Sequence, residues 1–266
     1  MKSAAPWDVR RECDFAVLTV QDRELAAVLA LTERPTEDHS VEGELIFNIS
    51  IPVASVSSAQ AALSGVVMPV GGIGRVQAAL TASQLLQRMT PRWLFLVGVA
   101  GGFHANGIRL GDIIVASQIY DYEVQRLTDE DSEVRMKVFE ADQVLLAAGR
   151  AANRRGRSES ILGPSDATVH FGPVLSGDKV IASEKVAATF LEKVPGLIGV
   201  EMEGAGVAAA VSRRGGGVRF LMIRGVVDLA NSHKRYDSST WRDRACDSAA
   251  AFTLMTAVQA HVIESS

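Results

Sequence analysis

The stretch that most constrains this chain is residues 199–231, where two short apolar runs each end in acidic side chains. The first run ends at Glu201 and Glu203. An alanine-rich segment and a Gly-Gly-Gly turn separate it from the second run, which ends at Asp228. Apolar runs separated by a helical segment are typical of strands in an α/β sheet. Because such sheets bind ligands where strands end, these carboxylates predict a site at that edge.

The rest of the chain alternates in the same way. Short, β-branched apolar runs predict strands at residues 15–20, 65–70, 93–97, 113–117 and 170–175. Apolar periodicity predicts helices at residues 75–89, 138–153, 184–193 and 240–262. No repeat or Pro/Gly/Ser-rich linker interrupts this order. We therefore predict an α/β fold, a three-layer α/β/α sandwich with a central mixed β-sheet.

The sequence indicates less about the two ends of the chain and about the segments that connect its predicted helices and strands. We expect residues 1–13 to form a flexible leader and residues 14–266 to form a single domain. The charged segment 120–137 is expected to be a solvated excursion from that domain. A polar connection at residues 231–236 is expected to lead into the last helix.

Charge and cysteine content narrow the function classes. The net charge of −4 argues against a nucleic-acid partner, because such a surface needs clustered cations. Cys13 and Cys246 lie far apart and near no histidine pairs, so we expect no disulfide, metal site or cofactor. No apolar run is long enough to span a membrane. We expect a soluble cytoplasmic protein that acts on a small molecule.

Two glycine-rich segments, residues 71–74 and 98–102, follow predicted strands. Glycines at these places let backbone amides approach a ligand. A dinucleotide fold would need an acidic residue after the strand at residues 93–97, and the segment that follows has none. We therefore exclude a dinucleotide cofactor and expect Ala100 and Gly101 to line the pocket.

Four short motifs follow one another in a specific order. They are residues 17–24, residues 98–102 with Gly111-Asp112, residues 200–204 and residues 224–228. In this order they resemble the nucleoside phosphorylase/nucleosidase superfamily, and most of all the methylthioadenosine/S-adenosylhomocysteine nucleosidases. The resemblance covers roughly residues 14–262 and implies the nucleoside phosphorylase-like fold and a homodimer.

The resemblance also implies a role for each acidic residue. Cleavage of an N-ribosyl bond develops positive charge on the sugar and negative charge on the base. Asp228 matches the aspartate that protonates the purine, and its apolar neighbours would favour the protonated form. Glu203 matches the residue that accepts hydrogen bonds from the ribose, and Met202 packs on the sugar. Glu24 matches the glutamate that activates water.

Each of these residues also has a structural interpretation. Asp228 would serve equally as the cap of the following turn, and Met202 as a core residue. Glu24 and Glu203 would each complement the dipole of a helix. Glu201 would share the face of Glu203 if the strand extends that far, which leaves its role open.

Hydrolysis is favoured over phosphorolysis. Phosphorylases of this superfamily place an arginine where this chain has Leu96 or Val97. Glu24 would also repel an anion. A purine nucleoside phosphorylase would need a cation from elsewhere, such as Arg75 or a neighbouring subunit.

The chain departs from the nucleosidase pattern around the base. Val180, followed by Ile181, stands where an aromatic residue stacks on adenine, and Val227 replaces a serine. Residues 231–244 look like relatives found as effector domains in bacterial defence proteins, some of which cleave nucleotides.

In such effectors, phosphates would be received by His233, Lys234 and Arg235, which would otherwise form a solvated loop. The predicted function is a purine N-ribosyl hydrolase acting on an adenine nucleoside or nucleotide, such as methylthioadenosine or S-adenosylhomocysteine. The alternatives are an AMP or ATP nucleosidase of a defence system, a purine nucleoside phosphorylase and a non-catalytic nucleoside-binding sensor. The joint presence of Glu24 and Asp228 favours an enzyme.

Overall fold

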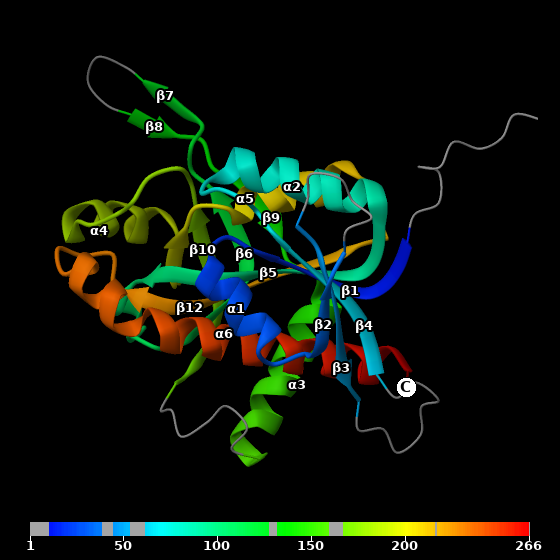
Figure 1. Cartoon of the computed structure of the whole chain (residues 1–266). Helices are drawn as coiled ribbons and strands as arrows, with labels where there is room; N and C mark the ends of the chain where they lie inside the picture. Colours follow the sequence, from blue (N-terminus) through cyan, green and yellow to red (C-terminus); the bar gives the residue numbers. More distant parts are fainter. Residues whose placement is uncertain are drawn as a thin grey trace, which may run out of the picture.

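A computed structural model describes residues 11–38, 45–53, 62–127, 132–159, 167–215 and 217–265 (Figure 1). The helices are α1 (Asp22–Leu29), α2 (Arg75–Arg88), α3 (Gln143–Glu159), α4 (Glu184–Lys193), α5 (Gly204–Arg213) and α6 (Lys234–Ser265), with a 3-10 turn at His104–Asn106. The strands are β1 (Arg11–Thr19), β2 (Glu33–Glu37), β3 (Phe47–Pro52), β4 (Ala62–Pro69), β5 (Met89–Gly102), β6 (Ile113–Asp121), β7 (Gln125–Leu127), β8 (Ser132–Val134), β9 (Lys137–Glu140), β10 (Val169–Ser176), β11 (Gly199–Glu201) and β12 (Arg219–Asp228).

The strands form one large mixed sheet in the order β11-β10-β6-β12-β5-β1-β4-β3-β2, with β9 paired to β6. Strand β5 lies between β1 and β12 and is parallel to both. Strand β11 pairs with β10 and also, in the antiparallel sense, with β5. Five strands therefore close into a ring, and their ends converge. The predicted α/β fold with a central mixed sheet is confirmed.

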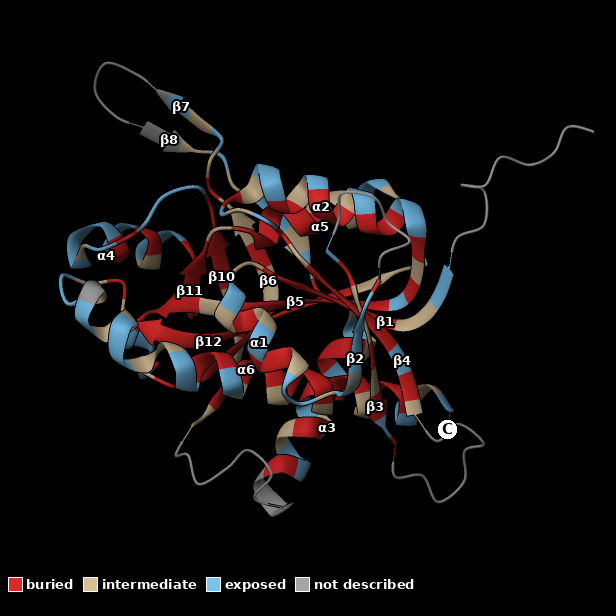
Figure 2. Ribbon diagram, in the orientation of Figure 1, coloured by how far each residue is buried: buried red, intermediate tan, exposed pale blue. Residues whose placement is uncertain are grey.

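Helices cover both faces of this sheet (Figure 1). Trp93 and Phe95 of β5 point into a core shared with α3 and α6. Leu94 and Leu96 point into the opposite core, against α2 and α5. Figure 2 shows buried residues along both faces of the central strands. Burial on two faces explains why these strands are continuous apolar runs rather than alternating ones.

Two glycines permit close approach between layers. A Cβ atom on Gly206 of α5 would lie 2.0 Å from the carbonyl oxygen of Arg75, at the start of α2. A Cβ atom on Gly225 of β12 would lie 2.2 Å from the carbonyl oxygen of Ala245 on α6. The first contact joins α5 to α2, and the second brings α6 directly over the strand that carries Asp228.

The segment 120–137 is only in part the solvated excursion that its charge suggested. Tyr122 is 1% exposed, and its ring lies 5.0 Å from that of Phe190 on α4. Strands β7 and β8 then form a hairpin that projects from the body (Figure 1). The acidic run at 129–131 lies outside the described residues.

Three predicted boundaries also differ. Residues 138–140 belong to strand β9 and not to a helix, because their backbone pairs with β6. Helix α3 begins after Asp142, whose carboxylate accepts hydrogen bonds from the first amides of the helix. Helix α6 begins at Lys234, six residues before the predicted start at residue 240. Strand β1 begins at Arg11, and residues 1–10 lie outside the described residues.

Among the described helices, none combines the length and apolar character needed to cross a bilayer.

The contact between Gly225 and Ala245 predicts the effect of a small substitution. Gly225→Ala should destabilise the protein by about 1–3 kcal/mol, because the added methyl group meets backbone that cannot rotate away. Urea unfolding followed by circular dichroism measures this change.

Gly72→Ala is the matched control, because the nearest atom to its new methyl group is Cγ of Gln77, a flexible and exposed side chain. Equal midpoints for the two variants would contradict the proposed contact.

Candidate active site

A pocket of ≈ 240 Å³ lies where strands β1, β5, β11 and β12 end. It brings together all of the predicted site residues: Glu24, Ala100, Gly101, Val180, Ile181, Glu201, Met202, Glu203 and Asp228. They come from five separate stretches of the chain. The convergence follows from the ring of strands, since parallel strands deliver their ends to the same edge.

Glu24 is held at the start of α1 and is 2% exposed. Its Oε2 atom accepts hydrogen bonds from the amides of Val20 (2.7 Å) and Gln21 (3.0 Å). Its Oε1 atom accepts one from the amide of Val99 at the end of β5 (3.1 Å). Glu24 is therefore an acidic residue of the first turn of α1, as its structural interpretation proposed, and it completes a capping box with Gln21. It also lies at the pocket wall, and a carboxylate has further lone pairs for a ligand.

The pocket floor contains a buried arginine that the sequence interpretation gave no role. Nη2 of Arg224 lies 2.6 Å from Oε2 of Glu201 and 3.0 Å from Oε2 of Glu203. A Cβ atom on Gly98 would lie 2.3 Å from Nη1 of Arg224 and 2.5 Å from Oε1 of Glu24. Glycine at position 98 thus leaves the space in which these two charged groups meet. Three carboxylates surround one guanidinium.

The charged groups of this cluster shift one another's pKa values. Burial disfavours the charged guanidinium of Arg224, but Glu201, Glu203 and Glu24 outweigh it and raise the pKa of Arg224. Burial raises the pKa of Glu203 to about 7, against the opposing effect of Arg224. Glu203 therefore changes its charge near neutral pH.

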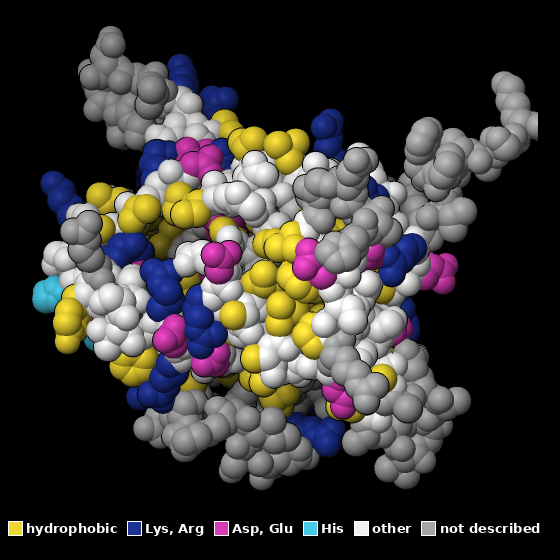
Figure 3. All heavy atoms as spheres, viewed as in Figure 1, with side chains coloured by type: hydrophobic (Ala, Val, Ile, Leu, Met, Phe, Trp, Pro, Cys, Tyr) yellow, Lys and Arg dark blue, Asp and Glu magenta, His cyan; other side chains and the backbone are white. Residues whose placement is uncertain are grey.

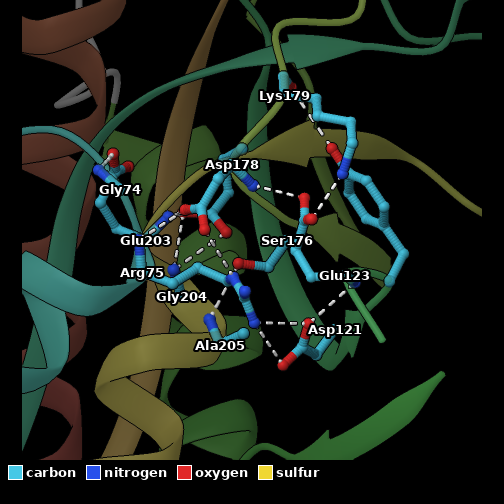
Figure 4. A network of polar contacts seen from close by, with 12 residues as sticks. Gly74, Arg75, Asp121, Glu123, Ser176, Asp178, Lys179, Glu203, Gly204 and Ala205 are labelled. Atoms are coloured by element: carbon cyan, nitrogen blue, oxygen red, sulfur yellow. Dashed lines mark hydrogen bonds and ion pairs between the residues drawn. The ribbon is translucent and has the colours of Figure 1, made fainter. Parts of the chain in front are cut away.

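Glu201 and Glu203 occupy different positions in the pocket. Glu201 accepts hydrogen bonds from the amides of Glu203 and Gly204, so it caps α5 as well as binding Arg224. Oε1 of Glu203 accepts a hydrogen bond from the amide of Gly74, in the glycine-rich loop before α2 (3.0 Å). Figure 4 shows Glu203 directed toward this loop. Glu201 is positioned to hold the cluster together, and Glu203 faces the pocket beside Met202.

Asp228 ends β12 and is 1% exposed. Its Oδ1 atom accepts a hydrogen bond from the amide of Ala230 (2.9 Å), so the predicted turn cap is present. Its Oδ2 atom lies 2.5 Å from Nζ of Lys234 and 3.3 Å from Oγ of Ser238. Gly101 allows this approach, because a Cβ atom there would lie 2.8 Å from Oδ1 of Asp228.

The apolar sequence neighbours of Asp228 are therefore only part of its surroundings. The ammonium group of Lys234 lies on its carboxylate. Val227, which replaces a serine, is buried beside it, and the hydroxyl of Ser238 on α6 contacts the same carboxylate from the other side.

The two apolar residues expected around the base differ in exposure. The side chain of Val180 is 64% exposed at the pocket mouth, whereas Ile181 is 5% exposed and packs in the core beneath α4. The wall of the pocket is exposed to solvent at one position and buried in the core at the next.

Arg75 does not supply a free cation to this pocket. Its Nη1 atom lies 2.8 Å from both carboxylate oxygens of Asp121, and its Nε atom lies 3.2 Å from Asp178 (Figure 4). Leu96 and Val97 stand where the sequence comparison expected a phosphorylase to carry its arginine, and both are buried in the two cores. The suggestion that Arg75 replaces the arginine of a phosphorylase is therefore wrong, since its charge is already paired.

The start of α6 adds Ser238 and Arg242, which the sequence interpretation missed, and Lys234, which it named only as a phosphate contact in nucleotide-cleaving effectors. Lys234, Ser238 and Arg242 line the pocket, and their spacing of four residues places them on one helix face. His233 is exposed, and the side chain of Arg235 lies outside the description. A helix predicted from residue 234 would have revealed this face.

Among the described residues, no group of three or more His, Cys, Asp or Glu is arranged to hold a metal ion.

Comparison with known proteins identifies relatives of this site. The model of the phosphorylase superfamily matches residues 17–259. A 5'-methylthioadenosine/S-adenosylhomocysteine nucleosidase from Maridesulfovibrio salexigens is 33% identical over 184 residues, which cover 68% of this chain and 74% of the relative. The nucleosidase of the same name from Desulfotalea psychrophila is 30% identical over 178 residues, covering 64% and 69%.

Solved structures share the fold. The nucleosidase of Colwellia psychrerythraea, in complex with adenine, has a TM-score of 0.75 at 22% identity and covers 94% of this chain and 97% of that chain. Futalosine hydrolase of Helicobacter pylori has a TM-score of 0.73 at 19% identity, covering 92% and 97%. These matches confirm the resemblance carried by the four motifs: the chain belongs to the phosphorylase superfamily, among its methylthioadenosine/S-adenosylhomocysteine nucleosidase-like members.

Proposed function

We propose that this chain hydrolyses the N-glycosidic bond of an adenine nucleoside or nucleotide, with water as the nucleophile. The family supports this activity, because the relatives that share 33% and 30% of aligned residues are nucleosidases of methylthioadenosine and S-adenosylhomocysteine. The single observation that carries the choice of hydrolysis is the buried cluster of Glu24, Glu201 and Glu203 around Arg224.

The cluster places negative charge where the reaction needs it. Arg224 neutralises at most one of the three carboxylates around it, so the pocket floor keeps an excess of negative charge. The ribosyl group becomes positively charged as the bond breaks, and nearby fixed carboxylates stabilise that charge. The same excess disfavours a phosphate nucleophile, which would have to enter against it.

Each ligand-facing acid has a separate task in this proposal. Glu203, with its Oε1 held by the amide of Gly74, accepts hydrogen bonds from the ribose hydroxyls while Met202 packs on the sugar. Glu24 accepts a proton from the attacking water and is held for that purpose by backbone amides from two strands.

Asp228 and Lys234 act together at the purine. The departing base takes up negative charge and needs a proton. Asp228 is buried at the end of β12 and shares a hydrogen bond with the ammonium of Lys234, so a proton is present in the pair at the place where the base leaves. The proton passes from the ammonium of Lys234 through the carboxylate of Asp228 to the purine, which neutralises the leaving group and leaves Lys234 as a neutral amine. Ser238 keeps the carboxylate oriented.

A homodimer is part of the same proposal. Ile73, Val76 and Leu80 lie at the start and along one side of α2, and their side chains are 64%, 69% and 55% exposed. Such an apolar stripe favours contact with another protein surface. Ile73 also lines the pocket, so a partner on this stripe would lie next to the substrate. A monomer in analytical ultracentrifugation would contradict this arrangement.

Phosphate independence tests the reaction type. Adenine release from methylthioadenosine, S-adenosylhomocysteine, adenosine, AMP and ATP should proceed equally well with and without phosphate, and the sugar product should be a free ribose derivative. Chromatography of the products measures both. Release of ribose 1-phosphate, or turnover only when phosphate is supplied, would refute hydrolysis.

Asp228→Asn tests the acid. Asparagine keeps an oxygen for the amide of Ala230 and for Lys234, but it cannot give up a proton. The variant should lose about 10²- to 10⁴-fold in kcat and should still bind adenine, as measured by steady-state kinetics and calorimetry.

Asp243→Asn is the matched control on α6, because Asp243 is an exposed carboxylate paired with Arg23. It should change kcat by no more than about twofold. Retained turnover in Asp228→Asn would remove Asp228 from its assigned role.

The raised pKa of Glu203 predicts a pH profile. Ribose hydroxyls donate to the ionised carboxylate, so kcat/KM for adenosine should rise as the pH increases through about 7 and level off above it. Glu203→Gln should raise KM and remove this part of the profile. A profile that stays flat through this range in the unmodified protein would contradict the assignment.

The same raised pKa has the opposite effect on folding stability, which should fall as the pH rises while kcat/KM increases. The pKa in the folded protein, about 7, lies above the ordinary value of 4.5. The stabilising contribution of protonated Glu203 is therefore fully present below the ordinary value and is lost as the pH rises through about 7.

A further inference from the structure

A second pocket of ≈ 530 Å³ opens beside the active-site pocket. The two pockets share Val180, Lys234, Ser238 and Arg242 in their walls. The two pockets are therefore adjacent and meet at the start of α6. A substituent of a bound nucleoside that is longer than the ribose itself would extend into this outer part.

The outer pocket is lined by hydroxyl groups and cations. Ser232, Ser238 and Ser239 contribute hydroxyls, and Lys234 and Arg242 contribute the charges. Among the described residues that line it, none is a carboxylate. This composition is the reverse of the inner floor, where three glutamates gather, and it matches an anion with several acceptor oxygens.

Arg242 differs from the other cations around the active site in its partner. Lys179 pairs with Glu123, and Arg224 with Glu201 and Glu203. The bond that the structure assigns to the guanidinium of Arg242 runs from Nη1 to the neutral side-chain oxygen of Gln21. Within the described part of the chain, no carboxylate forms an ion pair with Arg242, so its charge is available to a ligand.

The backbone adds to the positive potential. Helix α6 begins at Lys234 and continues for 32 residues, so its N-terminal amides and the positive end of its dipole lie at the outer pocket. In Figure 3, Lys and Arg side chains gather over the start of α6, with acidic side chains among them. On that helix, Asp243 and Asp247 pair with Arg23, and Asp237 in the first turn offsets part of the positive potential.

The active-site geometry indicates which part of a substrate reaches Arg242. The base lies at Asp228 and the ribose hydroxyls lie at Glu203 in the proposed function. The 5' substituent then has the rest of the wall, where Gln21 and Arg242 lie among apolar side chains that include Ile73 and Val180. The guanidinium of Arg242 is the group on this wall that favours an anionic substituent over a neutral one.

We propose that the outer pocket binds an anionic 5' substituent, so that the preferred substrate is an adenine nucleoside with a phosphate or carboxylate at its 5' end. The inference rests on the proposed N-ribosyl hydrolysis and specifies its substrate class. The cation of Arg242 and the hydroxyl of Ser232 hold the anion, while Lys234 serves both this pocket and Asp228. The hydroxyls of Ser238 and Ser239 stay on Asp228 and on the carbonyl of Tyr236.

A comparison of kcat/KM between substrates tests this inference. Adenine release is measured as kcat/KM for AMP, adenosine 5'-carboxylic acid, adenosine and methylthioadenosine, without added phosphate. The anionic compounds should exceed the neutral ones by about 10- to 100-fold, the effect of one or two charge-assisted hydrogen bonds. The AMP and carboxylic acid arms distinguish phosphate from carboxylate as the preferred anion.

Variants of α6 separate the anion pocket from the catalytic groups. Arg242→Gln should reduce the ratio of kcat/KM for AMP to that for adenosine by about tenfold or more, and Arg242→Lys should restore part of it. Arg244→Gln is the matched control, because Arg244 lies on the same helix, is exposed and stacks on Trp241 away from the pocket. It should leave both values unchanged.

The possible outcomes distinguish a failure of the anion pocket from a failure of the proposed hydrolysis. Adenine release with equal or better turnover of neutral nucleosides, or an equal effect of Arg242→Gln on all substrates, would overturn the anion pocket and leave the hydrolase standing. Turnover that depends on added phosphate would assign Arg242 to a phosphate nucleophile and overturn both. If none of the compounds is cleaved, the hydrolase fails. Calorimetry with AMP and adenosine then tests the pocket alone, which requires tighter binding of AMP that Arg242→Gln removes.

Discussion

The buried guanidinium of Arg224 is the interaction on which the site depends. It lies in β12 and binds carboxylates from β11 and from the start of α5, close to a third carboxylate on α1. A buried charge is tolerated only when it is paired, and removing one partner of such a pair typically costs about 3–5 kcal/mol. The pairing therefore constrains how β11 and β12 and both helices come together. Gly98 on β5 leaves the necessary space. The same constraint that holds these elements together also fixes the carboxylates at the sugar position.

Charge is distributed along the pocket in an order that suits the proposed chemistry. The floor carries an excess of carboxylates, which suits the positive ribosyl group of the transition state. The far end of the pocket holds Asp228 with its ammonium partner, which suits a base that gains negative charge. The outer part, lined by Arg242 and hydroxyls, is positive. A substrate with an anion at one end and a developing cation at its centre would meet complementary charge at each point, and binding at the outer pocket would orient it without neutralising the floor.

Much of the architecture could be predicted from the pattern of apolar residues. The runs that became β1, β4 and β10 each contain consecutive buried residues, and their short length and β-branched residues favoured strands over helices. Helix α4 was predicted with its observed bounds, since Ser183 caps it and Pro195 follows it closely. The start of α6 could not be predicted in this way, because its first turns carry polar residues with no apolar period. Tertiary contacts stabilise those turns, including the bond between Lys234 and Asp228.

The sequence by itself determined which residue types stand at the strand ends, and so it indicated Glu24, Glu203 and Asp228 together with their chemistry. It did not determine their partners. Glu201 and Arg224 are 23 residues apart, and Gln21 and Arg242 are 221 apart. Their contacts depend on strand register, on the irregularity between Val226 and Asp228, and on the close approach of α6 to Gly225. Such contacts arise only when the sheet is assembled, because the energy of a charge pair depends on distance and burial, which local sequence does not specify.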